Sequence, residues 1–177
     1  MFDMFFPDRY VASTYVIDFE KLYEEGIRGL IFDIDNTLVP HGAPADARAV
    51  KLFERLKNIG YQCCLISNNQ EPRVKMFNEK IQVDYVHNAH KPSKKNYKKA
   101  MEIMGTDTDN TLFVGDQLFT DVWGAKRVGI RNILVKPIHP KEEIQIVLKR
   151  YLERVVLHFY IRSAKREKKV EKRRKLL

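Results

Sequence analysis

Two closely spaced aspartates, Asp33 and Asp35, are the residues of this sequence best suited to chemistry, and they follow directly on the apolar run 29–32. A carboxylate at the end of a buried strand can attack an electrophilic phosphorus and form an acyl phosphate. A second acid two residues later can protonate the leaving oxygen and then deprotonate the attacking water. Because a carboxylate and a phosphate repel each other, the pair predicts phosphoryl transfer assisted by a hard cation such as Mg²⁺.

Three further polar clusters carry groups that fit the same chemistry. Ser67 and the amide of Asn68 are neutral donors for phosphoryl oxygens, and Lys91 offers a fixed positive charge. Asp116 can supply a second carboxylate to the metal ion, and Asp121 follows it closely. Each cluster taken alone has a plain structural explanation as a helix cap, a turn or a surface loop. Their order along the chain favours one shared site.

The sequence between these clusters alternates between short apolar runs and amphipathic stretches. The apolar runs predict strands at 29–32, 63–66, 83–86, 111–114 and 130–135. Helical spacing and end signals predict helices near 46–59, 72–77, 93–105 and 120–128. The end signals are Gly60, Pro72, Ser93 and Gly105. This alternation is typical of a three-layer, Rossmann-like α/β fold with a parallel sheet. Ligands of such sheets bind at the carboxyl ends of the strands, where all four clusters are predicted to converge.

Taken together, the four clusters resemble the motifs of the haloacid dehalogenase (HAD) superfamily. The matching segments are Asp33-Ile34-Asp35-Asn36-Thr37-Leu38, Ser67-Asn68-Asn69, Lys91-Pro92 and Gly115-Asp116-Gln117-Leu118-Phe119-Thr120-Asp121. The resemblance covers about residues 29–137, and Asp35 is similar to the second acid of the phosphatase members. The finer sequence resembles the YqeG branch of subclass IIIA, which is similar to mitochondrial phosphatidylglycerophosphate phosphatases.

The resemblance implies a role for each of these residues. Asp33 would be the nucleophile and Asp35 the general acid and base. Ser67 and Lys91 would hold the phosphate. The Mg²⁺ ion would be bound by Asp33, Asp116 and the backbone carbonyl of Asp35. Asp121 would act in the second shell, on a metal-bound water or on Lys91.

The spacing between the motifs leaves no room for a cap domain. One helix is predicted within 38–61, and one helix and one strand within 69–91. An open site suits a bulky phosphomonoester such as a phospholipid headgroup, a protein, a nucleic-acid end or a sugar phosphate on a carrier. Phosphatidylglycerophosphate is the named candidate. The alternatives are a HAD scaffold that binds RNA or the ribosome, and a soluble nucleotide or sugar phosphatase.

The net charge of +9 is concentrated at the carboxyl-terminal end, because residues 162–177 contain nine Lys or Arg and two Glu. We predict one phosphatase domain over 1–161 and a basic carboxyl-terminal helix or tail over 162–177. The tail is expected to be flexible, because a run of Lys and Arg extends in solution. Before the tail, an apolar stripe within 142–160 is interpreted as a helix that packs on the core. The tail could contact an anionic membrane or RNA. It has no aromatic interleaving, so base-specific reading is not expected.

The remaining features concern the cellular location of the protein. The chain contains no apolar stretch long enough to cross a bilayer and no secretory signal, which predicts a cytoplasmic location, peripheral to the inner face of the membrane. The adjacent cysteines Cys63 and Cys64 are interpreted as reduced, apolar strand residues. The sequence does not set the oligomeric state.

Overall fold

The structure is a computed structural model that describes residues 3–139 and 144–174. Its strands are β1 (Arg9–Val11), β2 (Gly29–Phe32), β3 (Gln62–Ile66), β4 (Asp84–Val86), β5 (Thr111–Gly115) and β6 (Arg131–Val135). Its α-helices are α1 (Phe19–Glu24), α2 (Ala47–Ile59), α3 (Glu71–Asn78), α4 (Lys94–Met104), α5 (Trp123–Val128) and α6 (Ile144–Arg174). Short helical turns are η1 (Asp3–Phe5), η2 (Thr14–Val16) and η3 (Leu118–Val122), the last of them π-helical.

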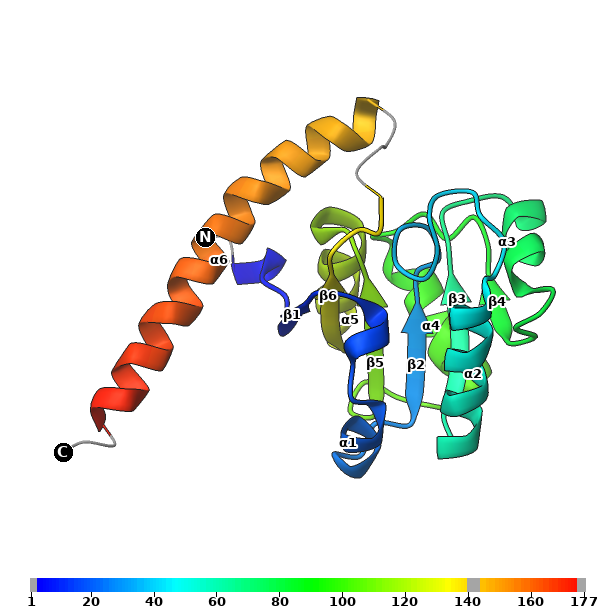
Figure 1. The fold of residues 1–177 in the computed structure, drawn as a ribbon, viewed down its shortest axis with the longest axis horizontal. Helices are drawn as coiled ribbons and strands as arrows, with labels where there is room; N and C mark the ends of the chain where they lie inside the picture. Colours follow the sequence, from blue (N-terminus) through cyan, green and yellow to red (C-terminus); the bar gives the residue numbers. More distant parts are fainter. Residues whose placement is uncertain (1–2, 140–143, 175–177) are drawn as a thin grey trace.

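The six strands form one parallel sheet in the order β1-β6-β5-β2-β3-β4 (Figure 1). The chain runs outward from β2 through β3 to β4, and then returns to the other side of β2 to form β5. The topological switch point therefore lies between β2 and β5, which is where parallel sheets of this kind bind ligands. This arrangement confirms the predicted three-layer α/β fold.

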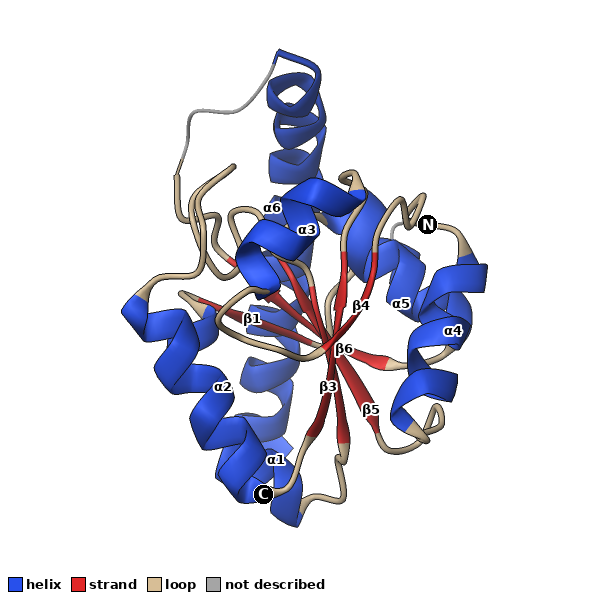
Figure 2. Cartoon of the chain, turned by 90° about the vertical axis from the view of Figure 1, so that its right-hand side faces the viewer, coloured by secondary structure: helices blue, strands red, loops and turns tan. Residues whose placement is uncertain are grey.

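Helices cover both faces of the sheet, as Figure 2 shows along its edge. Alternate residues of β2 point to opposite faces: Leu30 and Phe32 pack toward α1, α2 and α3, whereas Ile31 packs toward α4 and α5. Because side chains alternate along a strand and both faces are covered, the central strands β2 and β5 are buried at every position.

Helix α2 illustrates how local sequence sets the element boundaries. The Asp46 side chain caps its first turn by accepting a hydrogen bond from the backbone N–H of Ala49. Gly60 ends it with a φ of 109°, a left-handed conformation that a residue with a Cβ rarely adopts. Only this one helix lies between the carboxyl ends of β2 and β3, and only α3 and β4 lie between β3 and Lys91. Neither interval holds an additional domain.

Two parts of the structure depart from the sequence predictions. The sequence did not indicate β1 or α1, which are short elements near the amino terminus. The expectation that the chain is extended from Arg162 is wrong, because the backbone continues as one helix, α6, to Arg174. Lys, Arg, Glu and Ala all have high helix propensities, so a charged segment can continue a helix that has already formed. Residues 175–177 of the predicted tail lie outside the described residues.

The apolar stripe within 142–160 was also interpreted as packing on the core. This is wrong for four of its described side chains. Val156 is buried, but Tyr151, Leu152, Val155 and Phe159 are exposed. The remaining apolar side chains of the stripe, between 144 and 148, lie outside the described part, as does its start at 142 and 143. Within residues 3–139 and 144–174, no helix has both the length and the apolar character needed to cross a bilayer.

Candidate active site

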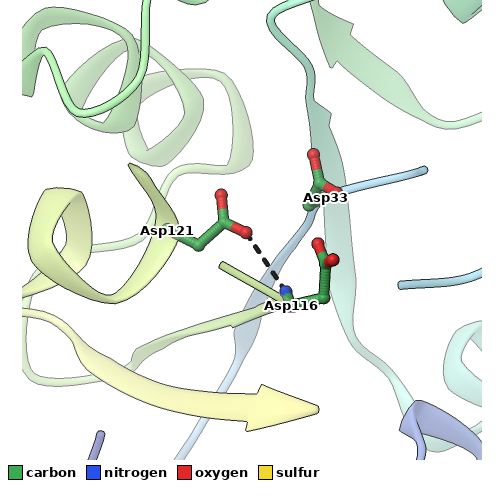
Figure 3. Close-up of side chains that lie close together, drawn as sticks. All are labelled: Asp33, Asp116 and Asp121. Atoms are coloured by element: carbon green, nitrogen blue, oxygen red, sulfur yellow. Dashed lines mark hydrogen bonds between the residues drawn. The ribbon is translucent and has the colours of Figure 1, made fainter. Parts of the chain in front are cut away.

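Asp33 and Asp116 lie side by side at the carboxyl ends of the adjacent strands β2 and β5 (Figure 3). The backbone N–H of Asp33 donates to the carbonyl of Val114 at 3.0 Å and so extends the hydrogen-bond ladder between β2 and β5. The hydroxyl of Thr37 lies 3.2 Å from an oxygen of Asp33 and 3.2 Å from an oxygen of Asp116. Both carboxylates are buried, so the switch point of the sheet holds two acids bridged by one hydroxyl.

Lys91 brings the positive charge to this point. Its ammonium nitrogen lies 2.5 Å from Asp33 Oδ1 and 2.7 Å from Asp121 Oδ1, with a side chain only 3% exposed. The side chain of Asn68 fixes the backbone of Lys91, because Asn68 Oδ1 accepts from the Lys91 N–H at 2.6 Å and Nδ2 donates to its carbonyl at 3.4 Å. Asn68 thus holds Lys91 in place, and its predicted contact with phosphate stays a prediction.

Asp121 shapes the loop that carries Asp116. Its Oδ2 accepts hydrogen bonds from the backbone N–H groups of Asp116 at 3.1 Å and Gln117 at 3.0 Å. Its Oδ1 contacts Lys91. The hydroxyl of Tyr97 on α4 donates to the carbonyls of Thr120 and Asp121, at 3.0 and 3.3 Å. The carboxylate of Asp121 therefore orients Lys91 and the backbone after β5. Its expected action on a metal-bound water stays a prediction.

Burial and charge act against each other on the ionisable groups of the cluster. Burial raises the pKa of the Asp33 carboxyl to about 6; Lys91 opposes this rise, and Asp121 adds to it. Burial alone would lower the pKa of Lys91, but the carboxylates of Asp121 and Asp33 outweigh burial and raise it. Lys91 therefore stays protonated, and a further positive charge beside Asp33 would lower the pKa of its carboxyl again.

The donor set fits a divalent, oxygen-binding cation. Carboxylate oxygens of Asp33, Asp116 and Asp121 all lie within 4.8 Å of one another, and all three residues are buried. Lys91 neutralises only one of these charges. Since Asp121 is occupied by Lys91 and two backbone N–H groups, Asp33 and Asp116 are the side chains best placed to bind the ion.

Asp35 lies outside this carboxylate cluster and has partners of its own. Its Oδ1 accepts from the backbone N–H of Gly42 at 2.7 Å and from Arg73 at 2.8 Å. Its Oδ2 accepts from the Asn69 side chain at 2.7 Å, and His41 Nδ1 lies 3.8 Å from Oδ1. The carboxylate is therefore held in one orientation by the turn after β3 and by helix α3. The predicted metal contact through its backbone carbonyl stays a prediction.

Ser67 follows β3 and is buried beside the same turn. Its backbone N–H donates to Val86 at 3.0 Å and its carbonyl accepts from Ala89 at 2.9 Å, which ties the ends of β3 and β4 together. Its hydroxyl oxygen accepts from the backbone N–H of Asn69 at 3.1 Å. A hydroxyl that accepts one bond keeps its own proton for a second partner. This geometry is compatible with the predicted contact to a phosphoryl oxygen.

Sequence reasoning missed three residues that build the site. Thr37 bridges the two buried acids, Arg73 binds Asp35, and Glu153 of α6 accepts a hydrogen bond from the backbone N–H of Leu118 at 2.8 Å. Thr37 stands inside the first motif, and Arg73 stands in the first turn of the helix after Ser67, so both were close to a recognised segment. Nothing in the sequence signals Glu153, because it reaches the site loop only through the fold.

Comparisons with known proteins agree with this geometry. A family model described as HAD-hydrolase-like matches residues 88–143, which include Lys91, Asp116 and Asp121. The protein of Bacillus subtilis (strain 168) named Probable phosphatase YqeG is 37% identical over 154 residues, which cover 86% of this chain and 90% of that protein. The chain belongs to the YqeG family of HAD-type phosphatases. The enzyme class predicted from the four motifs is thereby confirmed.

Other members of this superfamily match over less of their length or at lower identity. The Phosphatidylglycerophosphate phosphatase 1 of Arabidopsis thaliana is 27% identical over 168 residues, which cover 89% of this chain and 48% of that protein. The Glyceraldehyde 3-phosphate phosphatase of Pyrococcus abyssi is 29% identical over 97 residues, covering 50% of this chain and 41% of that protein.

Solved HAD-type structures share the fold. A HAD superfamily (subfamily III A) hydrolase of Legionella pneumophila is 20% identical with a TM-score of 0.52, over 68% of this chain and 71% of that one. NagD of E. coli K-12 is 14% identical with a TM-score of 0.51, over 62% of this chain and 87% of that one. At these identities the likeness concerns the fold alone.

Proposed function

We propose that this HAD-type phosphatase is a Mg²⁺-dependent phosphomonoesterase that transfers the phosphoryl group to Asp33. The proposal rests above all on the buried cluster at the β2–β5 switch point, where Asp33 lies beside Asp116 and contacts Lys91. Mg²⁺ bound by Asp33 and Asp116 would offset the repulsion between the nucleophile and the phosphate and would stabilise charge on the phosphoryl oxygens.

The first half of the reaction forms the aspartyl phosphate. An oxygen of Asp33 attacks phosphorus, and the bond between phosphorus and the leaving oxygen breaks. Protonated Asp35 gives its proton to that oxygen, so the product leaves as an alcohol. The Lys91 ammonium group and the Ser67 hydroxyl offer hydrogen bonds to the phosphoryl oxygens as charge builds on them.

The second half releases phosphate. Asp35, now ionised, takes a proton from a water molecule whose oxygen attacks the same phosphorus. The bond between phosphorus and Asp33 breaks, inorganic phosphate leaves and Asp33 regains its carboxylate. The proton balance closes, because Asp35 is protonated again and ready for the next substrate.

The open site favours a substrate whose phosphate is presented by a larger body. No domain is inserted between β2 and β3 or between β3 and Lys91 that could close over a small metabolite. We propose a phospholipid headgroup, with phosphatidylglycerophosphate as the candidate, since the Arabidopsis relative carries that activity in its name and aligns with 89% of this chain. The place of action would be the cytoplasmic side of the membrane, and both cysteines are free thiols, as in a reducing compartment.

Trapping of the phosphoryl-enzyme tests the chemistry. We expect incorporation of label from a radiolabelled phosphomonoester into the wild type and none into Asp33→Asn, with turnover reduced at least about a thousandfold. Asp84→Asn, an exposed aspartate at the start of β4, is the matched control and should keep full activity. Label that persists in Asp33→Asn would remove Asp33 as the nucleophile.

The substrate is tested by Mg²⁺-dependent phosphate release from phosphatidylglycerophosphate in mixed micelles, beside a soluble aryl phosphate and glyceraldehyde 3-phosphate. Turnover of the lipid well above both soluble compounds supports the proposal. Preference for the sugar phosphate would favour the small-molecule alternative. No turnover of any of them, with salt-dependent RNA binding, would favour the binding-protein alternative.

A further inference from the structure

Helix α6 presents two different faces. Its inner face packs on the body through Val156, which joins Leu118, Val122 and Leu134 in a small apolar cluster. The ring of Tyr160 packs edge to face against that of Phe6, with centroids 5.5 Å apart. Figure 1 shows the helix along the edge of the body beside the amino-terminal turn, with its far side turned outward.

The outer face is apolar and exposed between Tyr151 and Phe159. Tyr151 is 67% exposed, Leu152 55%, Val155 46% and Phe159 46%. With the neighbouring Ile161, these make up five of the nine large hydrophobic side chains exposed in the described part of the chain. Tyr151, Leu152, Val155 and Phe159 share one face of α6 by helical spacing. Four such side chains on one face mark an interaction surface, because single exposed apolar residues are normally scattered.

The same face becomes cationic further along the helix. Arg162 and Arg166 stand seven and eleven residues after Val155, so helical spacing places them on the outer face, and both are exposed. Residues 162–177 as a whole carry nine Lys or Arg against two Glu. We define the outer face of α6 by Tyr151, Leu152, Val155, Phe159, Arg162 and Arg166.

We propose that the outer face of α6 docks on an anionic lipid surface, with the helix lying in the interface. Aromatic and aliphatic side chains bordered by arginines combine apolar insertion with attraction to acidic headgroups. A second copy of this chain fits less well, because it would bring another strongly basic helix against this one. A core-packing role is excluded by the exposure of the face. The biological meaning of the docking rests on the proposed function, whereas the docking itself does not.

Docking on this face would hold the catalytic loop near the lipid. Glu153, on the inner side of α6, accepts from the backbone N–H of Leu118, two residues after Asp116. Val156 contacts η3, the helix that contains Asp121. The helix on the membrane would thus be tied directly to the segment that carries the metal-binding acid.

Co-sedimentation of the full chain with lipid vesicles tests the docking. We expect binding to vesicles of equal amounts of phosphatidylcholine and phosphatidylglycerol, and much weaker binding to phosphatidylcholine alone. The double variant Val155→Asp/Phe159→Asp should lower the partition at least about tenfold. The matched control Met76→Asp/Ile103→Asp changes two similarly exposed residues of α3 and α4 and should bind as the wild type does.

The charge contribution has its own pair of variants. Arg162→Gln/Arg166→Gln should weaken binding to the anionic vesicles roughly thirtyfold, and added salt should weaken the wild type in the same direction. Lys51→Gln/Lys57→Gln, which removes two exposed charges from α2, is the control and should leave binding nearly unchanged.

Several outcomes would overturn the docking. Unchanged vesicle binding in both α6 variants would exclude this face as the lipid contact. A concentration-dependent dimer that is lost in Val155→Asp/Phe159→Asp, without vesicle binding by the wild type, would assign the face to a second copy. Binding to RNA but not to vesicles would assign it to nucleic acid. Aryl phosphate turnover, measured in the same samples, separates a failure of docking from a failure of the proposed chemistry.

Discussion

At the scale of single residues, Arg73 combines a functional contact with a structural cost. Its NH2 group binds Asp35, but its buried Nε and NH1 atoms have no hydrogen-bond partner. A buried donor without a partner costs on the order of 1–3 kcal/mol. Such a cost is typical of a position where orientation of a reacting group matters more than stability.

We therefore expect Arg73→Gln to lower kcat about tenfold or more, since Asp35 would lose part of its orientation. The melting temperature should stay equal or rise, because the two unsatisfied donors are removed. Steady-state kinetics on an aryl phosphate and thermal unfolding check both parts. Lys75→Gln, on the same helix but at the surface, is the control. A fall in melting temperature with unchanged kcat would show a purely structural role.

Lys91 is a second residue whose removal has a measurable signature. Lys91→Met leaves the buried carboxylates of Asp33 and Asp121 without their cation, which should cost about 3–5 kcal/mol of unfolding free energy. Added Mg²⁺ should restore part of this loss, because a divalent cation supplies the missing charge. Urea unfolding with and without Mg²⁺ measures the difference, and Lys95→Met at the surface is the control. An equal effect of Mg²⁺ on both proteins would contradict the expected metal position.

The sequence was informative about the residues at the strand ends. Asp33, Lys91 and Asp116 could be grouped from sequence because parallel strands end at one edge of the sheet. Thr37 and Arg73 could not, since their contacts depend on the path of the loop after β2 and on the docking angle of α3. The contact of Asn68 with phosphate stays a prediction, and the structure adds that the Asn68 side chain holds the backbone of Lys91.

At the scale of elements, the link between α6 and the loop after β5 depends on Glu153. Glu153→Ala leaves the buried N–H of Leu118 without this acceptor, and should cost about 1–3 kcal/mol of unfolding free energy. The Mg²⁺ concentration needed for half-maximal activity should also rise, because Leu118 is two residues from Asp116. Denaturant unfolding and Mg²⁺ titration check these effects. Glu153→Gln keeps an acceptor oxygen and should behave more like the wild type; equal defects in both variants would exclude the hydrogen bond as the cause.

Element boundaries in the middle of the chain were predictable from local signals. Apolar runs between turn residues indicated β2, β3 and β5, and helical spacing closed by Gly60 indicated α2. β1 was missed because three residues on an edge carry too little pattern, and their pairing is decided by β6. The outward face of α6 was misread because apolar spacing predicts an amphipathic helix but not what its apolar side contacts.

At the scale of the whole molecule, β1 attaches the amino-terminal segment to the far end of the chain. Asp8, beside β1, accepts hydrogen bonds from the backbone and side-chain nitrogens of Asn132, both at 2.9 Å, and pairs with Lys126 at 2.8 Å. We expect Asp8→Ala to lower the unfolding free energy by about 1–2 kcal/mol. In Asp8→Ala, the amide protons of β1 should exchange faster than in the wild type, whereas those of β2 should not change. Equal protection of β1 in both proteins would mean that strand pairing alone holds the segment.

The pairing of β1 with β6 has a consequence for synthesis of the chain. Asp8 and Asn132 are 124 residues apart, so the first strand leaves the ribosome long before its partner exists. At 5–20 residues per second, the delay is on the order of ten seconds. During that time Phe5 and Phe6, which pack on late elements in the finished protein, have nothing to cover them. The nascent chain would therefore offer an aromatic segment to a ribosome-associated chaperone until α6, which carries the Tyr160 partner of Phe6, has emerged.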